Sequence, residues 1–251
     1  SVDLAISNVL GSNIMNVLLI LGLASIIYPL AVKASCIHFD IPIVSGISVL
    51  LLVFGLGDGI IGRVEGIIFW VLLLCYIIYM IRMTQKGQAQ MEETPEASTE
   101  DKIWKLLLLV VVGGAMIVIG SDVTVDAATA IAYAFGMTER LIGLTIVAFG
   151  TSLPELVTSC IAAKKKETDI AVGNIVGSNL FNILFVLGTT AIITPVAYTS
   201  AFIFDNIVAI AVMVLLWLFT VRGKRLSRFG GGVMLLLYAA YFANLVWGIV
   251  P

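Results

Sequence analysis

The sequence predicts an all-α polytopic membrane protein, and three observations lead to that fold class. The first is composition: 60% of the 251 residues are hydrophobic and 12% are charged, with a mean hydropathy of +1.11. The second is a series of apolar runs of about 20 residues, the length that spans the hydrocarbon core of a bilayer. The third is a block of sequence that recurs 166 positions later. Together they exclude a soluble domain of this size.

The apolar runs predict eight spanning helices. The longest polar stretch, 84–102, carries four glutamates and one proline without apolar periodicity, so it is expected to be a solvated loop. It separates a first half of three helices (1–83) from a second half of five helices (103–251). The expected helices are 3–28, 39–57, 61–82, 103–121 (or as far as 134), 139–163, 169–194, 202–221 and 229–250.

The basic residues predict the orientation of these helices. With eight spans, 12 of the 14 Lys and Arg residues lie in or beside loops on one side, and only Arg63 and Arg140 lie on the other. Cytoplasmic loops carry such an excess of positive charge. We therefore expect a plasma (inner) membrane protein with the 84–102 loop in the cytoplasm and the C-terminus at Pro251 on the extracellular or periplasmic side.

An internal repeat is the most informative feature of the chain. Residues 5–29 align with residues 171–195 at an offset of 166, with 12 identities in 25 positions. In the predicted orientation the two copies cross the membrane in opposite directions, as in the inverted repeats of many secondary transporters. The second copy is preceded by two helices that have no counterpart before the first copy. We therefore expect an N-terminally incomplete sequence.

The strongest candidate site is the Gly-Thr-Ser-Leu-Pro-Glu motif at 150–155, inside the apolar run 141–163. A carboxylate at membrane depth costs ~2.5–3.5 kcal/mol on insertion scales, so Glu155 is expected to have a partner for its charge. Pro154 has no N–H to donate to the carbonyl of Gly150, which predicts a broken helix with free carbonyl oxygens. Such oxygen ligands suit a hard cation such as calcium or sodium.

Two hydroxyls extend this candidate site. Thr151 and Ser152 precede Glu155 by four and three residues, so a regular helix would place all three on one face. Each hydroxyl could instead bond back to its own helix. Glu155 could also pair with a donor on another helix, although no basic residue lies at membrane depth in this sequence.

The repeated block supplies two further pairs of oxygen-bearing side chains. Ser178 and Asn182 are spaced i, i+4, and so are Ser12 and Asn16. Each pair presents a hydroxyl and an amide oxygen on one helical face, and these can ligate a cation without adding charge. The alternative is that the pairs form hydrogen bonds between helices.

Other polar and small residues favour structural roles. The acids near helix ends are interpreted as interfacial charges, and the remaining asparagines of the repeat as structural hydrogen-bonding groups. The glycines of the repeat are expected to allow close approach of helices or a helix break. These residues are Asp122, Asp126, Glu139 and Asp205; Asn8, Asn13, Asn174 and Asn179; and Gly11, Gly22, Gly173, Gly177 and Gly188.

The 150–155 motif, followed by Gly-Asn-x-x-Gly-Ser-Asn at 173–179, resembles the α-repeats of cation/calcium exchangers, most closely the prokaryotic sodium/calcium exchangers. The resemblance covers essentially the whole chain. It implies an inverted-repeat fold of ten helices, of which eight are present here and the first two are missing. It also implies the ligands of calcium and sodium, which are Glu155, Thr151, Ser152, Ala148 through its carbonyl, Ser178, Asn182, Ser12 and Asn16.

One residue of this chain departs from the family pattern, and the difference affects which ions are expected to bind. Some members carry aspartate where this chain has Asn182, and the amide removes a titratable group. Ion stoichiometry and potassium dependence therefore stay open. The first-half counterpart of Glu155 would lie in the missing helices, and with one carboxylate alone a calcium ion would be undercompensated.

The predicted function is antiport of sodium against calcium by alternating access, without enzymatic activity or a resident cofactor. The expected partners are sodium and calcium ions, the lipid bilayer and the missing N-terminal helices, with no nucleic acid. Two alternatives stay open: a proton/calcium or other cation antiporter, and a non-transporting membrane fragment or scaffold. A hydrolase built on Ser152 is disfavoured because the one histidine, His38, lies at a loop edge.

Overall fold

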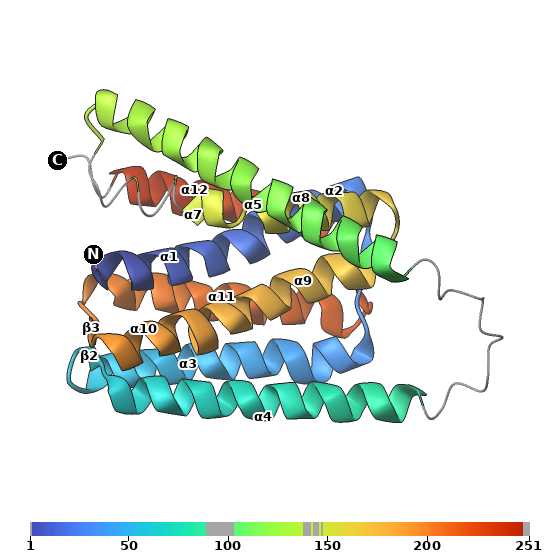
Figure 1. Cartoon of the computed structure of the whole chain (residues 1–251), viewed down its shortest axis with the longest axis horizontal. Coiled ribbons are helices and arrows are strands. Elements are labelled where there is room, and N and C mark those ends of the chain that lie inside the picture. The colour runs from blue at the N-terminus through green and yellow to red at the C-terminus, as the bar shows by residue number, and fades with distance from the viewer. Residues whose placement is uncertain (1, 89–102, 138–141, 143–145, 147, 248–251) are drawn as a thin grey trace.

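The computed structural model describes residues 2–88, 103–137, 142, 146 and 148–247. Figure 1 shows long helices that lie side by side in one slab. The helices, with π-helical segments marked η, are α1 (Val2–Met15), η1 (Asn16–Leu21), α2 (Gly22–Ile27), η2 (Cys36–Asp40), α3 (Ile41–Gly57), α4 (Arg63–Gln88), α5 (Ile103–Ala134), α7 (Ala148–Thr151), α8 (Leu153–Lys164), α9 (Thr168–Phe181), η5 (Asn182–Leu187), α10 (Gly188–Ile193), α11 (Ala201–Val221) and α12 (Arg228–Trp247).

The predicted helical membrane fold is confirmed. Within the described residues, six stretches of helix are long and apolar enough to cross a bilayer. The predicted span 139–163 falls partly outside the described residues. The last predicted span, 229–250, corresponds to α12, which is not one of the six stretches. The count of eight spans therefore stays a prediction. The six stretches are Ala5–Ile27, Cys36–Asp58, Arg63–Met83, Val111–Ala134, Thr168–Ile193 and Ala201–Val221.

One predicted boundary is wrong. α4 continues to Gln88, so the first residues of the stretch expected to be a loop are helical. Gln85, Lys86 and Gln88 have good helix propensity, which lets the helix extend beyond its apolar part. The rest of that loop, with its four glutamates, lies outside the described residues.

The elements recur along the chain at the spacing of the sequence repeat. α1, η1 and α2 reappear 166 residues later as α9, η5 and α10, and both π-helical segments begin at an asparagine. Figure 1 shows that α1 and the α9–α10 stretch run in opposite directions through the slab. This is the arrangement that an inverted repeat would have.

Two short antiparallel ladders, which the sequence did not predict, join the first half to the second. β1 (Leu30–Ala31) pairs with β4 (Arg225–Leu226), and β2 (Ile60–Ile61) pairs with β3 (Val196–Ala197). Each strand is a connection of two residues between helices, too short to show an alternating pattern. The ladders satisfy backbone groups in these connections.

Glycines allow two helix pairs to approach closely. A Cβ placed on Gly231 of α12 would lie 2.7 Å from the carbonyl oxygen of Gly22 in α2. A Cβ on Gly66 of α4 would lie 2.7 Å from the carbonyl oxygen of Gly188 in α10. The expected close approach is therefore confirmed at Gly22 and Gly188. It is wrong at Gly173 and Gly177, which have open space beside them and lie within the continuous helix α9, so they do not mark a helix break either.

The core is centred on the repeated block. Of the spanning stretches, Ala5–Ile27 is the most enclosed, with 78% of its most apolar window buried, whereas the window of Val111–Ala134 in α5 is 6% buried. Large apolar side chains on the outer helices are exposed, as expected for surfaces that face lipid. The polar side chains of the repeat are therefore placed at the centre of the molecule, and α5 lies at its edge (Figure 1).

Candidate ion-binding site

The helix that carries the motif is interrupted at Ser152, as predicted. α7 ends at Thr151 and α8 begins at Leu153, while Ser152 itself has φ −95° and ψ 0°. The Ser152 N–H donates to the carbonyl of Phe149, three residues back, at 3.2 Å. Pro154 then lies in the first turn of α8, where a missing N–H breaks no helical hydrogen bond.

The carbonyl of Gly150 is not free, which corrects the expectation from the sequence. The hydroxyl of Ser121 in α5 donates a hydrogen bond to it. Pro154 is the residue whose N–H would have bonded this carbonyl in a continuous helix. A side chain from another helix therefore replaces the backbone donor that the proline lacks.

The two carboxylate oxygens of Glu155 lie in different environments. Oε1 accepts a hydrogen bond from the hydroxyl of Ser178 in α9 at 3.1 Å. Oε2 is buried and has no hydrogen-bond partner within the described residues. Glu155 also lies in the first turn of α8, where the helix dipole favours a negative charge. One oxygen is thus held by the protein, and the other is available to a cation.

The two hydroxyl–amide pairs meet at the centre of the molecule. The amide nitrogen of Asn182 donates to the Ser12 hydroxyl at 3.2 Å and to the Asn13 side-chain oxygen at 3.0 Å. The amide nitrogen of Asn16 donates to the side-chain oxygen of Asn179 at 2.9 Å. The Asn16 oxygen is buried without a hydrogen-bond partner in the part of the chain that the structure describes.

The remaining predicted ligands belong to the interrupted helix. Thr151 is exposed, and its hydroxyl donates to the side-chain oxygen of Asn8 in α1 at 3.1 Å. Ser152 is buried, with 2% of its surface exposed. Ala148 opens α7. The structure places these residues beside α1 or at the helix break, and their roles as ligands stay predictions.

Structural hydrogen bonding is confirmed for three of the four remaining asparagines of the repeat, which are Asn13, Asn174 and Asn179. Asn13 and Asn179 bond across the two copies of the repeat, and Asn174 donates to the Ser159 hydroxyl at 3.2 Å and to the Glu155 carbonyl at 3.5 Å. The Ser159 hydroxyl in turn donates to the Ala171 carbonyl at 3.3 Å. These bonds hold α8, which carries Glu155, against α9, which carries Ser178.

The acids outside the motif are placed as follows. Asp205 is 3% exposed and accepts a hydrogen bond from the Tyr241 hydroxyl at 2.9 Å, so its interpretation as an interfacial charge is wrong. Asp122 and Asp126 are exposed, as expected, and Glu139 lies outside the described residues. Within the described part of the chain, no group of three or more His, Cys, Asp or Glu side chains could hold a metal ion.

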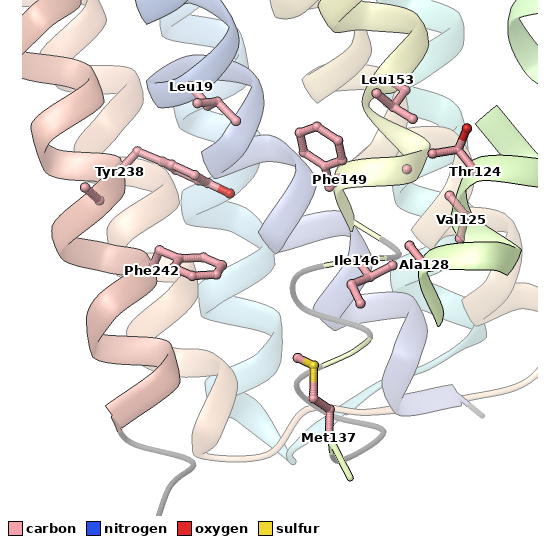
Figure 2. Close-up of a pocket in the computed structure, with 12 residues that line it drawn as sticks. Leu19, Thr124, Val125, Ala128, Met137, Ile146, Phe149, Leu153, Tyr238 and Phe242 are labelled. Carbon is pink, nitrogen blue, oxygen red and sulfur yellow. The ribbon is translucent and has the colours of Figure 1, made fainter. Parts of the chain in front are cut away.

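A separate pocket lies beside the interrupted helix and has a volume of about 530 Å³. Figure 2 shows Phe149 and Ile146 on one side of it and Tyr238 and Phe242 of α12 on the other. Its lining is almost entirely apolar, which suits hydrocarbon and does not suit a cation. The candidate ion site is therefore the central cluster of oxygens, and not this pocket.

Membrane-spanning helices around a part-buried carboxylate, with hydroxyls and amides from two repeated segments, are typical of a polytopic transport protein. The chain belongs to the sodium/calcium exchanger protein family, which it matches over residues 1–82 and 105–247. It is therefore an integral membrane protein of a cation/calcium exchanger family, which is a family of transporters and not of enzymes.

Relatives and a solved structure agree with this family. The chain is 34% identical over 261 residues to the inner membrane protein YrbG of Escherichia coli, covering 98% of this chain and 78% of that protein. It is 37% identical over 145 residues to the sodium/calcium exchanger MaX1 of Methanosarcina acetivorans, covering 57% of this chain and 41% of that protein. A structure of the sodium-calcium exchanger NCX_Mj superposes with a TM-score of 0.80 at 28% identity, covering 96% of this chain and 77% of that chain.

Sequence reasoning missed Ser121. It is a buried hydroxyl in the apolar stretch of α5, and its partner Gly150 lies 29 positions away on another helix. The one available signal was the Gly150 carbonyl, to which Pro154 has no N–H to donate. A buried carbonyl in that position requires a hydrogen-bond donor from elsewhere.

Proposed function

We propose that the chain exchanges sodium for calcium across the membrane, with the ions bound around Glu155. The observation that carries the proposal is the environment of this carboxylate, whose Oε1 is bound by Ser178 while its Oε2 is buried without a hydrogen-bond partner in the described structure. A carboxylate oxygen in this position is costly unless a cation pairs with it. Membership of the sodium/calcium exchanger family supports the same conclusion.

The proposed ligands are oxygen atoms. Glu155 supplies the negative charge, while hydroxyls, amide oxygens and one backbone carbonyl supply dipoles, which is the ligand type that calcium and sodium prefer. The buried, unpartnered side-chain oxygen of Asn16 supports this set. Because the two ions would share oxygens, their binding is mutually exclusive. The other proposed ligands are Thr151, Ser152, Ala148, Ser178, Asn182 and Ser12.

Alternating access is the proposed mechanism. The α1–η1–α2 segment and the α9–η5–α10 segment approach the same oxygens from opposite directions (Figure 1). In transporters built from inverted repeats, one repeat or bundle moves against the other and so opens the central site to each side in turn. The transported ions are substrates here, and the proposal includes no resident cofactor.

The proposed orientation places 84–102 in the cytoplasm and the C-terminus on the other side. It rests on the distribution of Lys and Arg, of which 12 of 14 lie on one side. A single cysteine introduced at Gln88, in a variant without the three native cysteines, tests it in intact cells. A membrane-impermeant maleimide should leave this cysteine unlabelled until the membrane is permeabilised. Labelling of intact cells would contradict the orientation.

The functional test is calcium-45 uptake into proteoliposomes. An outward sodium gradient should drive uptake, and the Glu155→Gln variant should lose it. Asp126→Asn, which removes an exposed carboxylate on α5, is the matched control and should retain it. Calcium-45 uptake that is driven by a proton gradient and does not depend on sodium would identify a proton/calcium antiporter instead. Unchanged uptake by the Glu155→Gln variant would contradict the proposed site.

A further inference from the structure

We infer that Ser121 is a positioning residue that couples α5 to the ion site through the carbonyl of Gly150. The inference rests on the proposed function, because it concerns how that site is held. The hydroxyl of Ser121 donates to this carbonyl, which lies at the interruption between α7 and α8. The bond is a buried polar contact between α5 and the helix that carries the motif.

In the part of the chain that the structure describes, α5 has few other contacts that restrain its position. Its spanning window is 6% buried, and the elements that it mainly contacts are α7 and α8. Ser121 is 8% exposed, whereas its neighbours Asp122 and Val123 are exposed. The packing of α5 against the protein is therefore concentrated at the helix break, close to the proposed ligands.

A second contact strengthens the first. Val125 follows Ser121 by one helical turn, so the two residues lie on the same face of α5. A Cβ added to Gly150 would overlap the Val125 side chain. Only glycine therefore allows α5 to come close enough for the Ser121 hydroxyl to reach the carbonyl.

The position of this carbonyl affects the ligands that follow it. Thr151 and Ser152 come directly after Gly150, and Glu155 lies one turn further along. The break at Ser152 separates α7 from α8, so the helical hydrogen bonds of α8 do not fix the direction of α7. The bond from Ser121 supplies a restraint on α7 at this break.

The surroundings leave room for α7 to move. The apolar pocket of about 530 Å³ is lined by Phe149 and Gly150 of α7 and by Val125 of α5 (Figure 2). A shift of α5 would break the Ser121 bond and let the Gly150 carbonyl turn. The hydroxyls of Thr151 and Ser152 would turn with it, so movement of α5 would change the geometry of the cation site.

The test compares two hydroxyl deletions on the same helix. Ser121→Ala removes the bond to Gly150, whereas Thr124→Ala removes a hydroxyl that donates to the carbonyl of Gly120 in its own helix at 2.7 Å. Calcium-45 binding to the purified full chain in nanodiscs reports the affinity. Amide hydrogen exchange of residues 148–153 reports the order of the helix break.

The Ser121→Ala variant should bind calcium with an affinity changed by roughly three- to tenfold, the effect of losing one buried hydrogen bond. It should also show faster amide exchange at 148–153. Thr124→Ala should match the wild type in both, and Ser121→Thr, which keeps the hydroxyl, should restore both. A lower melting temperature of Ser121→Ala with unchanged affinity and exchange would overturn the inference, as would equal effects of the two alanine variants.

The outcomes separate this inference from the proposed function. If the wild type binds no calcium, the proposed function fails. The role of Ser121 at the helix break is then decided by amide exchange alone. Faster exchange in Ser121→Ala but not in Thr124→Ala supports that role, and equal exchange in the two variants rejects it.

Discussion

Asn13 and Asn179 occupy equivalent positions in the two copies of the repeat, and each donates a side-chain hydrogen bond to the backbone carbonyl of the other at 3.1 Å. Their side-chain oxygens also accept from equivalent donors, Asn182 to Asn13 at 3.0 Å and Asn16 to Asn179 at 2.9 Å. A reciprocal set of contacts is what a twofold relation between two segments produces. The amides therefore join the two copies beside the proposed cation site.

Replacing Asn179 by alanine should destabilise the protein by about 1–3 kcal/mol, because the Asn16 amide and the Asn13 carbonyl would lose their partners in a buried place. The measurement is the melting temperature of the purified protein in detergent. Ser45→Ala is the control, since the Ser45 hydroxyl bonds only the Ile41 carbonyl of its own helix in the described structure. Equal shifts for the two variants would contradict the role of Asn179 in joining the copies.

Asn182→Asp should make the stability depend on pH. The Asn182 amide nitrogen donates to two acceptors, the Ser12 hydroxyl and the Asn13 side-chain oxygen. An ionised carboxylate cannot donate a hydrogen bond, whereas a protonated one can donate one of the two. The variant should therefore be more stable at low pH, and it should lose about 1–3 kcal/mol of stability as the pH rises and the new carboxylate ionises.

The check for Asn182→Asp is a series of melting temperatures between pH 5 and pH 8, with the wild type as control. Calcium should recover part of the loss at high pH, because a cation would compensate the added negative charge. If the melting temperature of the variant changed with pH as that of the wild type does, the hydrogen bonds donated by the Asn182 amide would not contribute to stability as proposed.

Two glycine-to-alanine changes should have opposite effects on stability. Gly231→Ala places a Cβ 2.7 Å from the Gly22 carbonyl oxygen and should cost about 1–3 kcal/mol, because α2 and α12 would have to separate. Gly46→Ala in α3 meets nothing within 4 Å and should stabilise the helix by roughly 0.5–1 kcal/mol. Melting temperatures of both variants provide the comparison, and a gain for Gly231→Ala would contradict the close approach.

The success of sequence reasoning depended on how local each signal was. The interruption at Ser152 was predicted because Pro154 removes a hydrogen bond within its own helix. The recurrence of α1, η1 and α2 as α9, η5 and α10 was predictable because the same residues recur at a fixed offset. In contrast, the bond from Ser121 to Gly150 and the pairing of Asp205 with Tyr241 join separate helices. Neither has a periodic or local signal, so only the packing of the helices could reveal them.

The error at Asp205 has a physical reason. Its place near the start of α11 gave no information on which helix would cover it. α12 covers it, and the Tyr241 hydroxyl replaces the water that an interfacial carboxylate would bind. Asp40 in the first half accepts a hydrogen bond from Tyr76 in the same way, at 3.2 Å, and it is only half-buried.

Tyr241→Phe should therefore cost more stability than Tyr76→Phe. Both changes remove one hydroxyl donor from an aspartate, but Asp205 is 3% exposed, so water cannot replace the lost bond. We expect a loss of about 1.5–3 kcal/mol for Tyr241→Phe, the range for a hydrogen bond to a charged group, and less than about 1 kcal/mol for Tyr76→Phe. Chemical or thermal unfolding of the two variants in the same detergent measures the difference. Equal losses would mean that the burial of Asp205 does not keep water from its carboxylate, and the acid would then be interfacial after all.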